Sequence, residues 1–486
     1  MTSQASADAD NSPPGPDLSA GWSELFTGRN GWRALALTGG VALHAVNVHI
    51  VTTVLPSVVR ELGGLDWYAW STTLFVVGSI VGAALSVRLL AALGPRGACL
   101  AALGVFAAGS VGCATALAMP WLLVGRTVQG LGGGILAALS YALIGRVFES
   151  RLWPRAVALV SGMWGVATLC GPAVGGLFAQ AGHWRWAFWA LLPLAVLQGL
   201  LVSWQLSSSA GVQHQRPDTL PRVPAPQIAL LTLSVLAIAA GGLLASLVAQ
   251  AVAVLFGLAL GWLASRQDRR AAVRLLPTGA YALGRPLGAI YAAIALLLVG
   301  TTTEIFVPYF LQLLQGHSPL TAGYLTAAMA AGWSVGSLAS SGRQGAAANR
   351  VLCLGPVLSA LGLGVLAWAV PTSGALAPGL TLVLMALALS AVGLGVGIGW
   401  PHLLTRVMAL APQGEEGVAS TSITTVQLYG MAVGAAIAGL VANAAGLTVP
   451  GGVTGAQSAA LWLFGSFALA PLAAAWLAVR AARGDA

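Results

Sequence analysis

Charged residues are scarce in this sequence, and lysine is absent altogether. Only 7% of the 486 residues are charged, whereas 57% are hydrophobic. A soluble domain usually carries about 25% charged residues, so most of this protein's surface has to face something other than water. The shortage of charge argues against an ordinary multidomain soluble enzyme and predicts an all-α integral membrane protein.

Several other signals are also missing. The four cysteines (Cys99, Cys113, Cys170 and Cys353) show no CxxC or other ligand spacing, so we expect inert thiols and no metal site. A Gly-rich phosphate loop with lysine is absent, which argues against ATP-driven transport by this chain alone; we expect no cofactor. Residues 1–32 are rich in Ser, Pro and Asp and lack the apolar core of a signal peptide, which predicts a disordered cytoplasmic tail.

Long apolar runs dominate the rest of the chain. A membrane-spanning helix needs about 20 apolar residues to cross roughly 30 Å of hydrocarbon. Fourteen segments meet this condition: 33–56, 68–90, 97–118, 120–143, 156–179, 186–205, 227–246, 248–265, 287–314, 320–340, 350–370, 379–403, 418–444 and 458–480. The sequence therefore predicts fourteen transmembrane helices.

The arginines predict the orientation. With the N-terminus inside, Arg60 and Arg185 fall outside and Arg126 lies within a span, while the remaining arginines fall on inner loops and tails. This asymmetry follows the positive-inside rule, which explains the net charge of +9 better than nucleic-acid binding does. We expect a multi-pass protein of the cell inner (plasma) membrane, with both termini cytoplasmic.

Polar segments divide the chain. We predict an N-terminal six-helix bundle at 33–205, a linker with two extra transmembrane helices at 206–285, and a C-terminal six-helix bundle with a short tail at 286–486. This 6+2+6 plan is typical of two pseudo-symmetric bundles that rock about a central cavity.

Three motifs carry a resemblance to a known family. The segment WLLVGRTVQGLGG (121–133) resembles the fourth-helix signature of the major facilitator superfamily, and SGMWGVATLCGPAVGG (161–176) resembles its antiporter signature. The segment WRWAF (184–188) is similar to a motif of the fourteen-helix drug:proton antiporter branch. The resemblance covers nearly the whole chain and implies a major-facilitator-type fold and export of small organic molecules in exchange for protons.

The second motif has a physical reading of its own. Gly175 and Gly176 permit close backbone approach between helices, and Pro172, after Gly171, bends its helix. We interpret these four residues as a conformational seal between the bundles; simple helix packing is an equally compatible reading. Arg126 in the first motif must point at a cavity, a partner or the membrane interface.

The sequence also departs from the family at two places. The inner-gate signature after the second helix keeps Gly94 and Arg96 but has Ala91 where the family carries Asp, which puts the usual inner-gate ion pair in doubt. In the first helix, Asn47 stands at the position of the family's acid, and His49 where a hydroxyl is common.

Proton coupling requires a titratable group in the membrane. Glu304 is the acidic residue that falls well inside a predicted span, where a carboxylate needs a partner or a proton. We assign proton coupling to Glu304, with His44 and His49 as helpers. The alternatives are a carboxyl that only hydrogen-bonds substrate or a neighbouring helix, and histidines that only pack. His44 and Asn47 share a helix face, whereas His49 points elsewhere.

The polar and aromatic candidates for a substrate cavity are Asn47, Arg126, Gln129, Tyr141, Trp164, Tyr309, Gln312 and Gln427. A mostly apolar cavity with one acid suits amphipathic or cationic organic molecules. The leading hypothesis is a proton-coupled exporter that works as a monomer, with a small-molecule substrate, protons and the lipid bilayer as its partners. An uncoupled facilitator or importer of a neutral metabolite is the alternative, and a polytopic membrane enzyme is a remote one; we expect no enzymatic activity and no nucleic-acid partner.

Overall fold

The computed structural model describes residues 22–206, 222–372 and 377–483, and every regular element in these ranges is a helix. The first half holds α1 (Trp22–Phe26), α2 (Gly28–Leu62), η1 (Leu65–Trp67), α3 (Trp70–Ala114), α4 (Met119–Ala142), α5 (Ile144–Val147), η2 (Ser150–Leu152), α6 (Trp153–Gln180), α7 (Trp184–Trp189) and α8 (Leu191–Gln205). Next come α9 (Ala225–Gly241) and α10 (Leu247–Arg270). The second half holds α11 (Pro286–Thr301), η4 (Thr302–Ile305), α12 (Val307–Gln315), α13 (Pro319–Ser340), α14 (Gly345–Ala369), α15 (Pro378–Ala409), α16 (Glu416–Ala444), α17 (Gly452–Phe467) and α18 (Leu469–Arg483).

Each of the fourteen expected spans overlaps one of these helices. Eleven helical stretches among the described residues are long and apolar enough to cross a membrane. One of them includes α3, which consists of two helices joined by a kink at Gly94, where φ is 69° and ψ 176°, so the expected spans 68–90 and 97–118 lie on either side of this kink. Helix α9 is a shorter apolar helix. The all-helical membrane fold is confirmed, and the number of membrane crossings stays a prediction.

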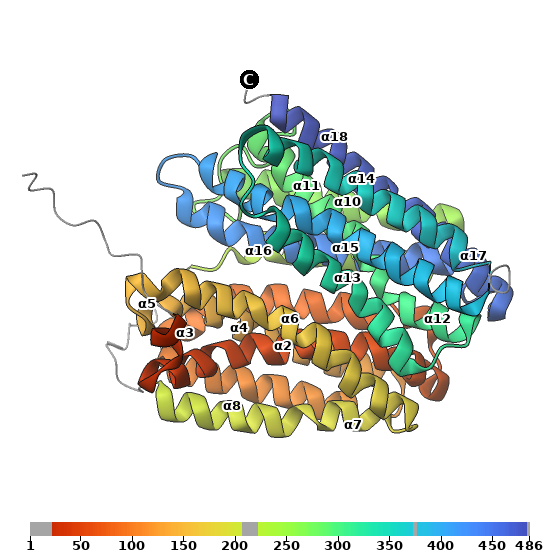
Figure 1. Cartoon of the computed structure of the whole chain (residues 1–486), viewed down its shortest axis with the longest axis horizontal. Helices are drawn as coiled ribbons and strands as arrows, with labels where there is room; N and C mark the ends of the chain where they lie inside the picture. The colour runs from red at the N-terminus through yellow and green to blue at the C-terminus, as the bar shows by residue number, and fades with distance from the viewer. Residues whose placement is uncertain (1–21, 207–221, 373–376, 484–486) are drawn as a thin grey trace, which may run out of the picture.

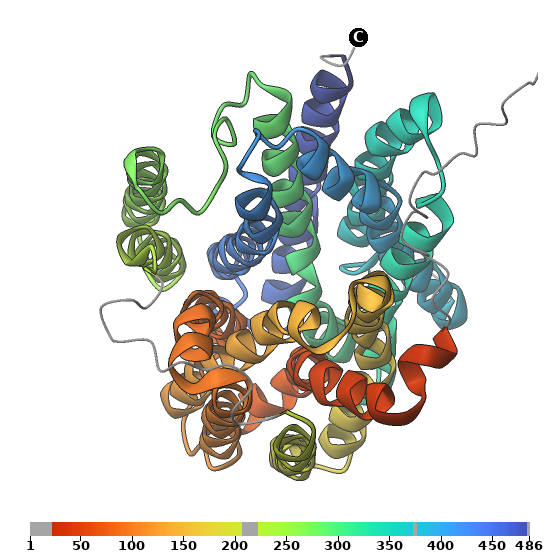
Figure 2. The same ribbon diagram turned by 90° about the vertical axis from the view of Figure 1, so that its left-hand side faces the viewer.

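The helices form two bundles (Figure 1). Helices α2 to α8 make the N-terminal bundle and α11 to α18 the C-terminal bundle. The pair α9 and α10 lies on one flank of both (Figure 2), where α9 packs against α16 and α3. The outer face of α10 leaves apolar side chains exposed, such as Leu247 at 74% and Leu255 at 66%, which suits contact with lipid tails.

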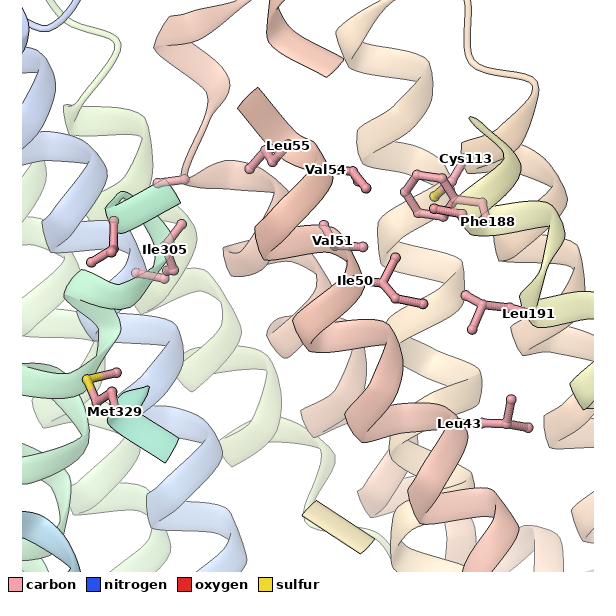
Figure 3. Packing of buried hydrophobic residues seen from close by; sticks show 14 of the residues in the cluster. Leu43, Ile50, Val51, Val54, Leu55, Cys113, Phe188, Leu191, Ile305 and Met329 are labelled. Carbon is pink, nitrogen blue, oxygen red and sulfur yellow. The ribbon is translucent and has the colours of Figure 1, made fainter. Parts of the chain in front are cut away.

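The central part of α2 lies between neighbours from both bundles (Figure 3). Ile50 points toward Phe188 and Leu191 of the N-terminal bundle, whereas Leu55 lies on the side that faces Ile305 of η4. All five side chains are buried in the largest apolar core of the described residues. The first helix of the chain therefore contributes to the interface between the bundles.

The two bundles approach each other most closely at one end. We call the end where α2 begins and α18 ends the terminal side, and the opposite end the far side. Figure 1 shows the bundles together at the far side and apart toward the terminal side. Near the far side, the ring of Tyr68 stacks on that of Phe306 with centroids 4.9 Å apart, and a methyl group at Gly176 would come within 2.7 Å of Leu320 Cα. The backbones of the two bundles therefore diverge from the far side toward the terminal side.

The start of the chain differs from the expected tail. Residues 22–26 and 28–32 are helical, whereas residues 1–21 lie outside the described residues. Helix α1 is anchored because Leu25 is fully buried and Glu24 pairs with Arg151 at 3.0 Å. The composition of this segment predicts disorder. Composition cannot reveal the anchor, because the anchor consists of one buried apolar residue and one ion pair with a loop that is distant in sequence.

Candidate functional site

Arg126 lies inside the N-terminal bundle rather than at the membrane interface. Its side chain is 1% exposed. Its guanidinium donates to Gln129 Oε1 at 2.6 Å and to the carbonyl oxygen of Ser71 at 3.4 Å, and it lies 4.1 Å from the centroid of the Phe75 ring. Gln129 in turn donates to Ser110 Oγ at 2.9 Å. Among the described residues no carboxylate pairs with Arg126, so an amide, a carbonyl and a ring face satisfy its charge.

His44 lies on the same aromatic ring. Its imidazole stacks on the Phe75 ring, with the ring centroids 5.2 Å apart. It meets the Trp164 ring edge-on, with the ring centroids 6.0 Å apart. Nδ1 of His44 faces Gly133 of α4, and a methyl group at Gly133 would come within 2.6 Å of this nitrogen. Phe75 thus joins the groups on α2, α4 and α6 into one cluster, which we call the Phe75 cluster: His44, Phe75, Arg126, Gln129 and Trp164.

Asn47 lies one turn from His44 and is fully buried. Within the described part of the chain, neither Nδ2 nor Oδ1 of Asn47 has a hydrogen-bond partner, and neither does Nδ1 of His44. An unsatisfied buried polar group costs about 1–3 kcal/mol. These atoms are therefore candidates for contact with a bound molecule, because the protein itself leaves their hydrogen bonds unmade.

His49 points away from this cluster, as the helix geometry predicts. It is half-buried and lies against Gly171 of α6, where it occupies the space that a larger side chain would need. Pro172 lies against Gly323 of α13. The structure therefore separates the two histidines, and places His49 at the contact between α2 and α6.

The remaining residues of the predicted seal lie between α6 and its two neighbours. A methyl group at Gly175 would come within 2.9 Å of the Ile50 carbonyl oxygen, and Gly176 faces Leu320 across the gap between the bundles. The Gly-Pro segment thus packs against α2 of its own bundle and α13 of the other. This position is compatible with both the seal and the packing interpretation.

Glu304 lies where the helix of the ninth expected span is interrupted. It belongs to the short 3₁₀ turn η4 between α11 and α12, is half-buried, and has no hydrogen bond or ion pair among the described residues. Two residues on, Phe306 stacks on Tyr68 of the N-terminal bundle. A carboxyl group without a partner therefore lies beside the contact that closes the far side.

The other predicted cavity residues are spread over both bundles. Tyr309 contacts Tyr68 edge-on with centroids 5.5 Å apart, and Gln312 has a buried Nε2 without a partner among the described residues. Gln427 is half-buried. Tyr141 is 44% exposed, with its hydroxyl 3.4 Å from Ser161 Oγ. No contact among the described residues joins Glu304 to the Phe75 cluster, so the predicted site divides into two separate groups.

The predicted inner gate lies at the break in α3. Gly94 adopts a positive φ that favours glycine, which explains the retention of this part of the signature. Arg96 is half-buried and makes no ion pair within the described ranges. The absence of the acid at Ala91 thus leaves this arginine without a carboxylate partner here.

Sequence reasoning missed two acidic anchors on the terminal side. Asp268 is fully buried and accepts hydrogen bonds from the backbone N–H groups of Leu275 and Leu276, at 2.7 and 3.1 Å, and from the Tyr281 hydroxyl at 2.9 Å. Glu415 accepts from the backbone and side chain of Thr278 at 2.5 and 2.7 Å, and these bonds lower the pKa of Glu415 below its usual value. Both acids order the loop after α10, and nothing in their sequence context indicates this role.

The sequence of this chain is similar to those of known membrane transporters. The pattern of the family described as Major Facilitator Superfamily matches residues 37–435. A protein of Mycobacterium tuberculosis (strain ATCC 25618 / H37Rv) described as a probable multidrug-efflux transporter is 38% identical over 428 residues, which cover 87% of this chain and 90% of that protein. An uncharacterized MFS-type transporter of the same strain is 29% identical over 321 residues, which cover 62% of this chain and 44% of that protein.

Solved structures give the same fold. A peptide transporter, POT, in complex with alafosfalin has a TM-score of 0.65 at 16% identity, with 93% of this chain and 95% of that chain covered. A D-xylose-proton symporter has a TM-score of 0.62 at 16% identity, with coverage of 93% and 97%. At such low identity the likeness concerns the fold alone.

Proposed function

The chain belongs to the major facilitator superfamily, and on that premise we propose that it exports small organic molecules, amphipathic or cationic, in exchange for protons by alternating access. The relatives named as multidrug-efflux transporters support export. The observation that carries the proton coupling is the position of Glu304: a half-buried carboxyl inside an apolar span, without a partner among the described residues.

The coupling follows from the place of this carboxyl. Glu304 lies two residues from Phe306, whose ring forms part of the contact between the bundles. A charged carboxylate in an apolar setting is costly, so closing the bundles around it favours the protonated form, and opening them to water favours release. Proton binding at Glu304 then biases which side of the transporter is open, and the energy of the proton gradient drives export.

The N-terminal bundle supplies the proposed substrate surface. The unpaired atoms of Asn47 and His44 and the exposed ring of Trp164, at 39%, offer hydrogen bonds and an aromatic face. Arg126 has its charge satisfied within its bundle, so its role is to hold Gln129 and Phe75 in place. This makes the N-terminal half the specificity half and the C-terminal half the coupling half.

The topology completes the proposal. We place both termini in the cytoplasm, since most arginines then lie on the inner side, and we retain the 6+2+6 plan of the fourteen-helix branch. With this orientation the terminal side is the cytoplasmic side, and the backbones of the two bundles diverge toward the cytoplasm. The transporter acts as a monomer, because each chain carries both bundles.

The test uses purified protein in proteoliposomes loaded with a fluorescent cationic dye. With an imposed pH gradient, the wild type builds a dye gradient, whereas Glu304→Gln exchanges dye down its own gradient but builds none. Glu416→Gln, which changes an exposed acid outside the apolar part of its helix, serves as the matched control and keeps full coupling. If Glu304→Gln still concentrates dye from a pH gradient, the coupling assignment is wrong.

A second candidate, an uncoupled facilitator or importer of a neutral metabolite, is favoured by two residues. Asn47 stands where the family's first-helix acid is expected, and Ala91 where its inner-gate acid is. Under this alternative, wild-type transport in the same liposomes does not respond to an imposed pH gradient, and Glu304→Gln changes nothing. The same experiment therefore separates the two functions.

A further inference from the structure

A cavity of about 520 Å³ lies at the terminal side, away from both parts of the proposed transport site. It is formed where α1, the start of α2 and the loop after α5 meet. Its lining residues are Glu24, Thr27, Arg29, Asn30, Arg33 and Arg151. Three of these six side chains are arginines, so the cavity is strongly basic for a protein with 7% charged residues.

Two of the arginines have no carboxylate to neutralise them. Arg151 pairs with Glu24 at 3.0 Å and with Glu149 at 2.9 Å. Arg29 and Arg33, by contrast, form no ion pair among the described residues, although they are four residues apart on one face of α2 and line the same cavity. Like charges at this spacing repel each other. The positive end of the α2 helix dipole adds to the same field, so the site favours an anion.

Exposed tryptophans place this cavity at the depth of lipid headgroups. Trp32 lies between the two arginines in sequence, is 47% exposed, and packs against Trp204 of α8 with ring centroids 5.4 Å apart. Trp153, at the start of α6, is 44% exposed. Tryptophan gathers at the boundary between membrane and water. The cavity therefore opens where the phosphates of the adjacent leaflet lie.

We propose that this cavity binds the phosphate of an anionic phospholipid, with Arg29 and Arg33 as its main ligands. Arginine binds phosphate through paired N–H donors, and basic pockets at helix ends near the cytoplasmic leaflet suit acidic headgroups. The same chemistry would accept free phosphate. The tryptophans favour the lipid, because a lipid's acyl chains can lie along the apolar surface beside them.

The proposal is tested by titrating purified full-length protein with phosphatidylglycerol or phosphatidylcholine and counting bound lipids by native mass spectrometry. We expect the wild type to prefer phosphatidylglycerol, and the double variant Arg29→Gln/Arg33→Gln to bind it about thirtyfold more weakly. Arg343→Gln/Arg350→Gln removes two other exposed arginines, one from the loop between α13 and α14 and one from the start of α14, and should bind like the wild type. Equal binding of both lipids by the wild type, or unchanged binding by the first variant, overturns the proposal.

Two further arms keep the test decisive. Arg29→Lys/Arg33→Lys retains the charges and is the milder change should the glutamine variant fail to fold. It should bind phosphatidylglycerol with an affinity between those of the wild type and the glutamine variant; equal affinity for both lipids in this variant contradicts the proposal. Inorganic phosphate at millimolar concentration should leave the bound lipid in place. Displacement of the lipid by inorganic phosphate shows that the site serves free phosphate and overturns the assignment to lipid.

Discussion

The two bundles differ in how they accommodate an ionisable side chain within an apolar span. In the N-terminal bundle, Arg126 is fully enclosed and its charge is satisfied by Gln129, a backbone carbonyl and the face of Phe75. In the C-terminal bundle, Glu304 is half-buried and has no partner among the described residues. A satisfied charge fixes the helices around it, whereas an unsatisfied one can exchange a proton with water. We therefore assign a rigid role to the N-terminal bundle and proton exchange to the C-terminal bundle.

The strongest test of this contrast is Arg126→Ala. The change removes a buried side chain and leaves Gln129 and Phe75 without their partner, so we expect the free energy of unfolding to fall by about 3 kcal/mol. Thermal unfolding of the purified protein measures this loss, with Glu304→Gln as the counterpart that should not lower the melting temperature. Equal losses in the two variants would remove the distinction between the halves.

The next largest effect is expected from a substitution at the contact between the two bundles. A methyl group at Gly176 would come within 2.7 Å of Leu320 Cα, so Gly176→Ala should weaken the arrangement closed at the far side by roughly 1–3 kcal/mol. Labelling of a cysteine introduced at Tyr309 with an impermeant reagent should become faster. Gly364→Ala, at a site with no neighbour within 4 Å, is the control. An unchanged labelling rate in Gly176→Ala would mean that this contact does not hold the bundles together.

Asn47 should behave in the opposite direction to Arg126, although it lies in the same bundle. Both polar atoms of its amide lack partners, so Asn47→Leu removes an unmet hydrogen-bonding need and should stabilise the empty protein by about 1 kcal/mol. The same variant should lose affinity for substrates that carry a hydrogen-bonding group. A fall in melting temperature without substrate would show that the amide is satisfied in solution.

The smallest effect concerns Glu415 on the terminal side. Its pKa is lowered by the hydrogen bonds from Thr278, so the charged form stabilises the folded state above the ordinary glutamate pKa of about 4.3. This contribution is lost as the pH falls through the lower pKa of the folded state. Glu415→Gln should cost under about 1 kcal/mol at pH 7 and nothing at the acidic end. An equal cost at both pH values would contradict the assignment.

Much of the fold could be predicted from the sequence because hydropathy and arginine placement are strong signals. The apolar runs predict the helices, and the Gly-Pro segment at 171–176 predicts the close packing of α6. Gly94 and Pro95 lie in the gap between the predicted spans 68–90 and 97–118, and the helix of α3 is interrupted there, at Gly94. Helix α1 could not be predicted, because only one buried leucine and one ion pair hold it in place.

The site was less predictable than the fold. A helix that is apolar on all sides has no amphipathic face from which its rotation could be read. The composition of α2 and α4 therefore could not show that His44 and Arg126 share the ring of Phe75. Helix spacing did separate His49 from His44 correctly, because both lie on one regular helix.

Proton release upon substrate binding tests the central claim most directly. In weakly buffered detergent solution, addition of a cationic substrate to the wild type should release close to one proton per bound molecule, as reported by a pH indicator dye. Glu304→Gln should bind substrate and release none, whereas Glu416→Gln, at an exposed acid outside the proposed site, should release protons like the wild type. Undiminished release from Glu304→Gln, or its loss in Glu416→Gln, would contradict the assignment of titration to Glu304.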